Sequence, residues 1–482
     1  MLRKFPNSGE ILVAAALLCV IVATFLVNQP IAFPLDDAYI TIANAHQILT
    51  AQVDGFGQNQ PTGATSLIHL IMLAALGTVV DLPTASFILA TIAASLYVVG
   101  LYRLLRLLSA NEVLASLGTL GGFLGGAAWF QLMNGLETGL AMAAVAWAAY
   151  LAQYPDHTRI QVLLAVLIGA LPFIRPELGV LSATLVAAVL IRLRRLPYRL
   201  LGLGFCTALT VIILASMAWM VTGELIPRTA GAKIAFFAES SLPLAEKIYN
   251  AALAVFQSPL AVVLTGMVFL ARIRGGWAFI VFAMLFWTIT ALSLPSGLSH
   301  NLYRYLYVLV PLGLAGWAVF SVQNKTTGGT AALVTGIGAS VLIATFFVSG
   351  WGYYRTNLRV TADQETLVIW AQANLPGDAR ILIHDAGYFA WRTHFHLVDL
   401  VGLKSPSSIA VHRRLTLASS GTKRGEAISQ IAHKGRVTHA IILERPFWRD
   451  IHRDLRQQGW QVEPLRADPG QLYRLYRLTP PK

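Results

Sequence analysis

Apolar segments of membrane-spanning length recur along most of this chain, and they constrain its fold more than any other feature. A helix that crosses a bilayer needs about 20 mostly apolar residues. The 482 residues are 56% hydrophobic and 12% charged, whereas soluble proteins carry about 25% charged residues. Suitable stretches lie at residues 11–28, 84–106, 112–132, 136–153, 160–174, 177–193, 198–221, 251–271, 276–294, 301–320 and 330–350. The sequence therefore predicts a mainly α, polytopic membrane protein with about eleven transmembrane helices.

The positive charges predict how the chain crosses the membrane. Cytoplasmic loops of membrane proteins carry an excess of Lys and Arg. With the N-terminus inside, the inner loops collect about twice as many of these residues as the outer loops. This orientation requires the short apolar run 66–80 to lie in the membrane interface, as part of a first outer loop at 29–83. We therefore expect a multi-pass protein of the inner (cytoplasmic) membrane.

The net charge of +13 does not indicate nucleic acid binding. The basic excess is divided between membrane loops and a polar tail, and no basic run with interleaved aromatic residues stands out. The two cysteines, Cys19 and Cys206, both lie in apolar runs and predict no disulfide framework.

Residues 357–482 differ in kind from residues 1–356, which form the expected membrane module. The tail contains strand-like runs at 380–384, 396–403, 437–444 and 471–478, separated by helical or turn-rich stretches. This pattern predicts a small C-terminal α/β domain, which the charge distribution places outside the cytoplasm.

Two adjacent acids, Asp36 and Asp37, directly follow the first apolar segment. One interpretation is structural, because Asp36 suits the N-cap of a helix over 36–50 and Asp37 its first residue. A cap needs only one acid, however, and two like charges at the edge of a membrane are costly. Neighbouring carboxylates near a medium of low dielectric have a raised pKa, as a general base requires. We therefore expect both acids to be catalytic.

Further polar residues fall at the outer membrane edge and are candidates for substrate binding. They are Glu137, Arg175, Glu177, Arg228, Lys233, His300 and Arg304. Each also has a structural interpretation, as a charge that favours a helix start, as part of a local ion pair or as a solvated loop charge. Arg304 is the least ordinary of them, because an arginine at this depth is well placed to hold a lipid phosphate.

Several stretches resemble, in chain order, the GT-C class of integral-membrane glycosyltransferases, which take a sugar from a polyprenyl-phosphate donor. "LDDAYITIANAHQI" looks like the acidic motif of the first extracytoplasmic loop, and "QNQPTGATSL" like the loop that follows it. "NGLETGL", "RPELG", "IPRTAGAK" and "RYLYVLVP" resemble the successive membrane-edge motifs. The pattern is most similar to terminal arabinofuranosyltransferases and to bacterial mannosyltransferase-like proteins. Where the class often has Arg-Tyr after the acidic motif, this chain has Ala43-Asn44.

The resemblance implies an inverting transfer of a sugar, arabinofuranose or mannose-like, to an envelope glycan, lipid or protein. By analogy Asp36 is the general base, and Asp37 orients the acceptor or helps to hold a divalent cation. Arg304 is the first choice for the leaving phosphate, with Lys233, Arg228 and Arg175 as alternates. No cofactor is indicated beyond such a cation, and the resemblance leaves the requirement for a metal open.

Two other functions are compatible with these residues. A flippase or transporter for lipid-linked sugars would favour charges at the membrane midplane and repeated halves. A non-catalytic membrane scaffold would retain the same fold with an altered loop. The charges cluster at one membrane edge and no repeat is visible, which favours the glycosyltransferase.

Overall fold

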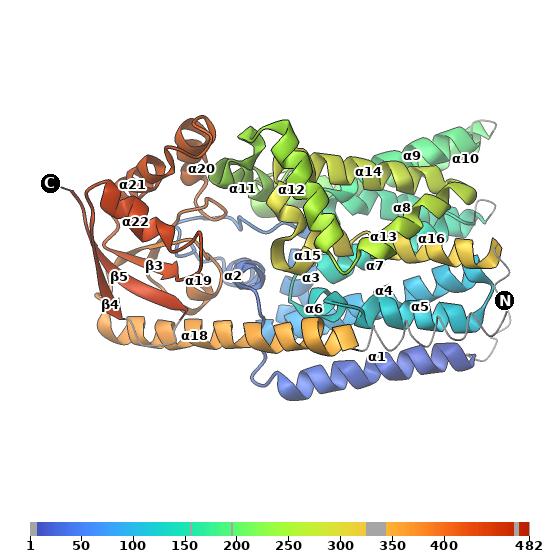
Figure 1. Cartoon of the computed structure of the whole chain (residues 1–482), viewed down its shortest axis with the longest axis horizontal. Coiled ribbons are helices and arrows are strands. Elements are labelled where there is room, and N and C mark those ends of the chain that lie inside the picture. Colours follow the sequence, from blue (N-terminus) through green and yellow to red (C-terminus); the bar gives the residue numbers. More distant parts are fainter. Residues whose placement is uncertain (1–6, 155–156, 194–195, 324–343, 467–471, 482) are drawn as a thin grey trace.

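Two parts make up the chain in this computed structural model, a helical module and a domain built around a β-sheet (Figure 1). The structure describes residues 7–154, 157–193, 196–323, 344–466 and 472–481. Most of the eleventh expected span, 330–350, lies outside the described residues. Figure 1 shows the helices packed roughly side by side on the right and the sheet domain on the left.

The helical module is formed by elements of very different length. In chain order they are α1 (Ser8–Val27), α2 (Asp36–Thr50), α3 (Leu67–Gly77), α4 (Leu82–Ser109), α5 (Glu112–Leu124), α6 (Ala128–Met133), α7 (Thr138–Leu151), α8 (Thr158–Ile174), α9 (Leu178–Leu193), α10 (Pro197–Thr222), α11 (Thr229–Phe237), η1 (Glu239–Ser241), α12 (Leu244–Gln257), α13 (Ala261–Thr265), η2 (Gly266–Arg272), α14 (Gly276–Ser293), η3 (Pro295–Leu298), α15 (His300–Tyr307) and α16 (Val310–Gln323).

Four of the described helices are long and apolar enough to cross a membrane, namely α1, α4, α10 and α14. Two bent pairs reach this length together, α12 with the segment Ala261–Arg272 and α15 with the first part of α16. Other expected spans appear as shorter apolar helices, among them α5, α7, α8 and α9. The chain is thus a multi-pass membrane protein, while the count of eleven spans stays a prediction.

The second part begins with a long helix and continues into alternating strands and helices. Its elements are η4 (Phe346–Trp351), α18 (Gly352–Asn374), β1 (Arg380–Ile383), α19 (Tyr388–Arg392), β2 (His396–Asp399), α20 (Pro406–His412), η5 (Arg413–Leu417), α21 (Arg424–Gly435), β3 (His439–Leu443), α22 (Asp450–Gln457), β4 (Gln461–Arg466) and β5 (Tyr473–Thr479).

The five strands form one mixed sheet in the order β2-β1-β3-β5-β4. The first three strands are parallel, and β5 and β4 are added antiparallel. Four of these strands lie in the predicted runs. The sequence analysis missed β4, an edge strand that contains Pro464 and an irregular register beside it. Proline cannot donate to a ladder and is tolerated at such an edge, which is why the pattern did not indicate a strand.

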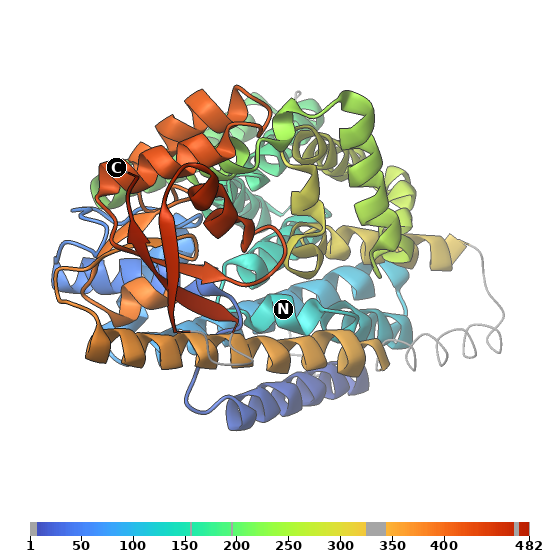
Figure 2. The ribbon, with the colours of Figure 1, turned by 60° about the vertical axis from the view of Figure 1, so that its left-hand side comes forward.

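Helix α18 links the two parts along its length, as Figures 1 and 2 both show. Near its start, Tyr354 accepts a hydrogen bond from the amide of Asn28, just after α1. Two residues before its middle, Thr361 donates to the carbonyl oxygen of Phe33. The carboxylate of Asp363 accepts the backbone N–H groups of Leu472 and Tyr473 at 3.0 and 2.9 Å, at the start of β5. The same helix therefore orients the sheet domain and the segment that leads into α2.

A buried lysine ties the sheet domain to the first loop. The ammonium group of Lys404 lies 2.8 Å from the carboxylate of Asp54 and 2.6 Å from the side-chain oxygen of Asn44. The amide of Asn44 also donates to the carbonyl of Thr62. The departure from the GT-C pattern at position 44 thus has a local reason, because Asn44 holds the loop together and binds a cation from the other domain.

Candidate functional site

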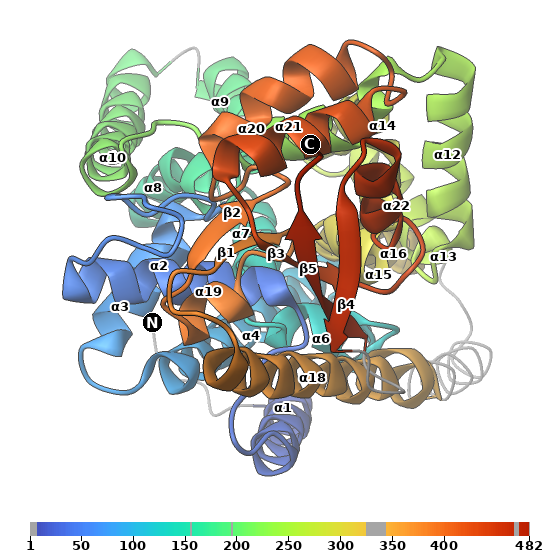
Figure 3. The ribbon, with the colours of Figure 1, turned by 90° about the vertical axis from the view of Figure 1, so that its left-hand side faces the viewer.

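A cavity of about 440 Å³ lies between the helical module and the sheet domain. The helical module contributes the start of α2, α11, η3 and α15. The sheet domain contributes the residues that follow β1, β2 and β3, so the carboxyl ends of the parallel strands face the cavity. Figure 3 views this junction from the side of the sheet, with α2 and α15 lying behind the strands. Ligands of parallel sheets bind at this edge, which makes the cavity the candidate active site.

Asp36 joins the two parts at the cavity wall. One carboxylate oxygen, Oδ2, accepts the backbone N–H of Gly387 at 2.7 Å. The other, Oδ1, accepts the backbone N–H of Tyr388 at 2.8 Å and the amide of Gln364 at 3.1 Å. Burial raises the pKa of Asp36 to about 8, with repulsion from Asp385 adding to the shift and the two backbone hydrogen bonds opposing it.

The interpretation of Asp36 as an N-cap is wrong, although both acids lie in the first turn of the helix. Helix α2 begins at Asp36, its N-cap is Leu35, and no side chain caps it. The carboxylate of Asp36 is therefore directed to the other domain and not to its own helix. An aromatic contact strengthens this junction, because the buried ring of Tyr39 packs against Tyr388 and Trp391, with centroids 4.8 and 5.5 Å apart.

Asp37 faces two cations from distant parts of the chain. Its Oδ2 lies 3.7 Å from the ammonium of Lys233 on α11 and 3.5 Å from the guanidinium of Arg304 on α15. Burial alone would raise the pKa of Asp37, but the charges of Lys233 and Arg304 outweigh burial and hold it below its usual value. The two adjacent acids thus differ in protonation state. Asp36 favours its protonated form near neutral pH, and Asp37 is ionised.

Arg304 is 3% exposed, and it lies in an unusually polar part of the interior. Its Nε and Nη1 atoms have no hydrogen-bond partner among the described residues. A small void of about 20 Å³ is lined by Arg304, Asp37, Lys233 and Glu137, among others, and Asp37 and Lys233 also line the main cavity. Asp37 balances the charge of this guanidinium at 3.5 Å from Nη1 but leaves both donors without a hydrogen bond, so the position is suited to bind a second anion.

Behind this void lies a second ion-paired group. Arg175 is buried, with its Nε 3.4 Å from Glu137 and its Nη2 2.8 Å from Glu177. Its guanidinium also lies over the ring of Tyr305, 4.8 Å from the centroid. The structure therefore brings Glu137, Arg175 and Glu177 together, but Arg175 and Glu177 do not line the main cavity.

The two remaining candidates, His300 and Arg228, lie in different places. His300 lines the main cavity. Arg228 is half-exposed and pairs with Glu224 at 2.7 Å, and it lines neither the main cavity nor the small void.

The backbone directly before Arg304 is strained. Asn301, Leu302 and Tyr303 all have left-handed conformations, with φ of 47°, 56° and 63°. Such a conformation costs roughly 1–2 kcal/mol per residue for an L-amino acid other than glycine. The buried amide of Gln131 donates to the carbonyl oxygens of Asn301 and Leu302 at 2.8 and 3.2 Å and so supports the turn. Strain of this kind gathers at functional sites, and here it directs His300 and Arg304 toward the acids.

Sequence reasoning missed the contribution of the sheet domain to the cavity. Asp385 follows β1, and its Oδ2 accepts a hydrogen bond of 2.5 Å from the hydroxyl of Tyr473. Its Oδ1 lies 3.2 Å from His384 Nδ1, while His384 Nε2 accepts the backbone N–H of Leu443. Burial alone would raise the pKa of Asp385, but His384 and the Tyr473 hydroxyl hold it below its usual value. The available signal was the position of Asp385 directly after a predicted strand.

Metal ligands do not gather in the part of the chain that the structure describes. No three His, Cys, Asp or Glu side chains are grouped there in a way that would hold an ion. Asp37, the acid that the resemblance linked to a cation, is paired instead with Lys233 and Arg304.

Comparisons with known proteins agree with this architecture. Over 96% of its length the chain is similar to the crystal structure of ArnT from Cupriavidus metallidurans bound to undecaprenyl phosphate, with a TM-score of 0.55, 11% identity and 97% of that chain covered. The apo state of the same protein gives a TM-score of 0.55 and 12% identity, with 96% of this chain and 98% of that one covered. The chain has the GT-C fold.

Two further comparisons add less. The Archaeoglobus fulgidus oligosaccharyltransferase in its apo form gives a TM-score of 0.45 and 12% identity over 89% of this chain and 69% of that chain. Residues 352–476 match a domain family described as a domain of unknown function, DUF8728. No curated protein matches the chain.

We expect Gly387→Ala to loosen the junction between the two parts. A Cβ at this position would overlap the backbone oxygen of Asp36 and lie 2.9 Å from its Oδ2. Overpacking of this kind costs about 1–3 kcal/mol. The variant should unfold at lower temperature and be cleaved faster by protease between the helical module and the sheet domain. Gly377→Ala is the control, because its Cβ would meet nothing within 4 Å. Equal behaviour of the two variants would contradict the close contact.

Gln131→Leu should release the strained turn. The change leaves two carbonyl oxygens without their donor, and each buried unsatisfied group costs about 1–3 kcal/mol. Hydrogen exchange of the backbone amides at 301–307 should then become faster, while exchange in α4 stays unchanged. Gln372→Leu removes a comparable bond to the carbonyl of Arg392 at an exposed site and should leave the turn protected. Unchanged exchange in Gln131→Leu would show that the turn does not depend on this amide.

Proposed function

We propose that this protein is an inverting glycosyltransferase. It moves a sugar, arabinofuranose or mannose-like, from a polyprenyl-phosphate donor to a cell-envelope glycan, lipid or protein acceptor on the extracytoplasmic face of the inner membrane. The observation that carries the proposal is the buried guanidinium of Arg304, whose open donors lie beside Asp37 and Lys233 at the edge of a cavity with a second acid, Asp36.

The leaving group of such a reaction is a lipid phosphate. It needs no proton from a general acid, but the negative charge that develops on it must be stabilised. Arg304 offers Nε and Nη1, and Lys233 supplies a second positive charge across Asp37. His300 lines the main cavity. Arg175 does not line it, and it would influence the phosphate only through its contacts with Glu137 and Tyr305.

The position of Asp36 suits the general base of an inverting displacement. In such a reaction the attacking hydroxyl and the leaving phosphate lie on opposite sides of the sugar carbon. The cations gather around Asp37, whereas Asp36 faces the sheet domain. A carboxylate has about four acceptor positions, and three at Asp36 are used, which leaves one on Oδ2 for a hydroxyl. Asp37 would then hold the cations in place and orient the substrate.

An apolar cavity supports a lipid-linked donor. It measures about 360 Å³ and lies between the loop 61–67, the end of α8 and α10, a helix that exposes most of its surface. Gly63 and Thr65 line this cavity and also the small void at Arg304, so a lipid tail there would bring its phosphate to the guanidinium. The similar ArnT structure, which contains undecaprenyl phosphate, is consistent with a donor of this class.

Replacement of Arg304 by Gln should reduce transfer from the polyprenyl-phosphate sugar. Loss of one donor to a developing oxyanion lowers kcat by about 10²–10³. The assay is transfer by the detergent-solubilised protein, in which a flippase or scaffold would show no product. Arg414→Gln, which removes a cation bonded to Gln430 on the exposed side of the sheet domain, is the matched control and should keep full activity. Full activity of Arg304→Gln would refute the phosphate role.

The base assignment predicts a particular pH dependence. A base must be unprotonated to act, and the pKa of Asp36 is raised to about 8. In the wild type, kcat/KM should therefore rise with pH up to about 8 and fall about tenfold for each pH unit below it. Asp36→Asn should abolish transfer at every pH, and its unfolding temperature must be measured as well, because Asn offers one acceptor oxygen to the two backbone N–H groups that Asp36 accepts. A flat profile between pH 6 and 8, or an active Asp36→Asn, would exclude Asp36 as the base.

A further inference from the structure

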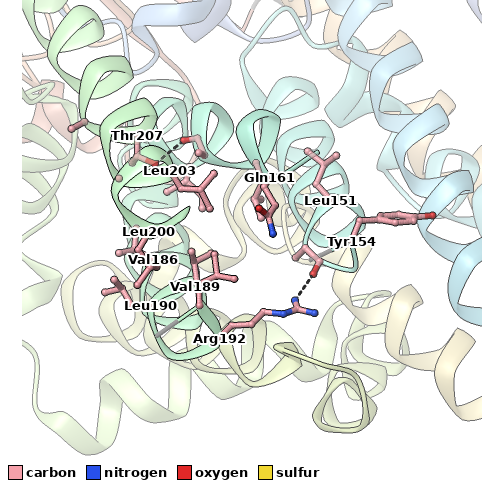
Figure 4. Close-up of a pocket in the computed structure, with 17 residues that line it drawn as sticks. Leu151, Tyr154, Gln161, Val186, Val189, Leu190, Arg192, Leu200, Leu203 and Thr207 are labelled. Atoms are coloured by element: carbon pink, nitrogen blue, oxygen red, sulfur yellow. Dashed lines mark hydrogen bonds between the residues drawn. The ribbon is translucent and has the colours of Figure 1, made fainter. Parts of the chain in front are cut away.

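A separate cavity of about 270 Å³ lies between α8, α9 and α10, with residues at the end of α7 closing one side (Figure 4). Helix α8 begins, and α9 ends, at the end of the helical module away from the sheet domain (Figure 1). The cavity is therefore distinct from the candidate active site, whose lining it does not share.

The lining of this cavity changes in polarity from one end to the other. One end is formed by Tyr154, Gln161 and Arg192, and the guanidinium of Arg192 donates to the carbonyl oxygen of Ala152 at 3.1 Å. The other end is formed by aliphatic side chains and by Thr207, whose hydroxyl is bonded to the carbonyl of Ala165. Figure 4 shows Arg192 at the end opposite to Thr207. An occupant with one polar head and one apolar chain matches this gradient.

Gln161 adds a second polar group at the end of the cavity where Arg192 lies. The residue is 7% exposed and lines the cavity. Figure 4 shows its side chain directed into the cavity, toward the side where Arg192 lies. Its amide can donate a hydrogen bond to an ester or phosphate oxygen of an amphiphile in the cavity.

The surroundings of the cavity point to the bilayer as the source of its occupant. In α10, only Ala218 is buried, and its apolar residues Leu201, Phe205 and Ile212 are 75%, 67% and 61% exposed. This helix therefore lies at the periphery of the module, where lipid surrounds it. Basic pockets between transmembrane helices bind anionic lipid head groups, and Arg192 supplies the positive charge that lines this cavity.

We propose that this crevice binds one anionic phospholipid. An acyl chain occupies the apolar end between α8, α9 and α10, an ester oxygen accepts from Gln161, and the phosphate lies at Arg192. Arg175 lies between the end of α8 and the start of α9, and Arg192 lies in the last turn of α9. The two arginines are therefore at opposite ends of α9, and we place this lipid in the leaflet opposite to the candidate active site. The inference holds whether or not the protein transfers sugars.

Two glycines of α10 provide a matched pair of variants. A Cβ at Gly204 or at Gly202 would meet nothing within 4 Å, so larger residues fit at both positions without a clash. Only Gly204 lines the cavity. Gly204→Phe therefore fills the crevice, while Gly202→Phe places the same ring on the same helix outside it.

Native mass spectrometry of the full chain in detergent tests the proposal, with dioleoyl-phosphatidylglycerol and dioleoyl-phosphatidylcholine added in equal amounts. The wild type and Gly202→Phe should retain one phosphatidylglycerol, and Gly204→Phe should retain at least about tenfold less, because the apolar end is blocked. Arg192→Gln should lower the preference for phosphatidylglycerol by about fivefold, the contribution of one basic residue near an anionic head group. If Gly204→Phe does not accumulate, Ala208→Phe fills the same crevice from one turn away.

Equal retention by Gly204→Phe and the wild type would overturn the proposal. So would an equal loss in Gly204→Phe and Gly202→Phe, which would place the lipid on the outer surface of α10 and not in the crevice. A third arm adds undecaprenyl phosphate in place of the phospholipid. If Gly204→Phe lost only that lipid, the crevice would be a site for the donor lipid and the phospholipid assignment would be wrong.

Discussion

The structure depends most on the contact between the carboxylate of Asp36 and the backbone amides of Gly387 and Tyr388. This contact holds the carboxyl edge of the parallel strands against the start of α2, and the main cavity exists because those two surfaces face each other. Gly387 permits the close approach, since any side chain there would meet Asp36. The arrangement keeps a carboxylate in a buried position beside Asp385, which is also what raises its pKa. One residue thus assembles the site and acquires the acid–base property that the proposed chemistry needs.

The charges around this contact are balanced by residues far away in sequence. The first outer loop contains no Lys or Arg, so the acids at 36, 37 and 54 have no local partner. The balancing cations come from α11, from α15 and from the sheet domain, as Lys233, Arg304 and Lys404. Removal of one member of a buried ion pair leaves an uncompensated charge and is strongly destabilising. The acidic loop can therefore fold only when the later helices and the sheet domain are in place, which couples the site to the whole fold.

The sequence predicted the polytopic character, four of the five strands and the placement of Asp36, Asp37, Lys233 and His300 at one membrane edge, and in the structure these four residues line one cavity. These predictions follow from the lengths of the apolar runs, from the alternation of apolar and polar residues in strands and from the positions of the charges. All three can be read from short stretches of sequence or from a sum over the chain. It did not predict β4, whose proline disguises an edge strand, nor the left-handed turn at 301–303, which is stable only because Gln131 supports it from α6. The position of Asp385 after a strand was a signal, but its hydrogen bond with Tyr473 was not predictable, because the two residues are brought together only by the folded sheet. The miss of β4 has a local cause, whereas the turn and the Asp385–Tyr473 pair depend on tertiary contacts between distant segments.

The fold of this protein tolerates more substitutions than its candidate site does. A chain that is 11% identical to ArnT retains its architecture over nearly its full length, because helix packing tolerates many apolar substitutions that keep volume and pattern. A catalytic site tolerates few substitutions. A buried cation that pairs with no anion lowers the stability of a protein, and so does a buried acid whose pKa is raised but which transfers no proton. The burial of Arg304 and Asp36 carries part of this cost, which the ion pair with Asp37 and the hydrogen bonds from Gly387 and Tyr388 offset. Asp36 also joins the helical module to the sheet domain, and Arg304 also balances the charge of Asp37, so an apolar residue at either position would remove a contact on which the fold depends. The same two residues thus serve the fold and supply the acid and the cation that the proposed chemistry needs.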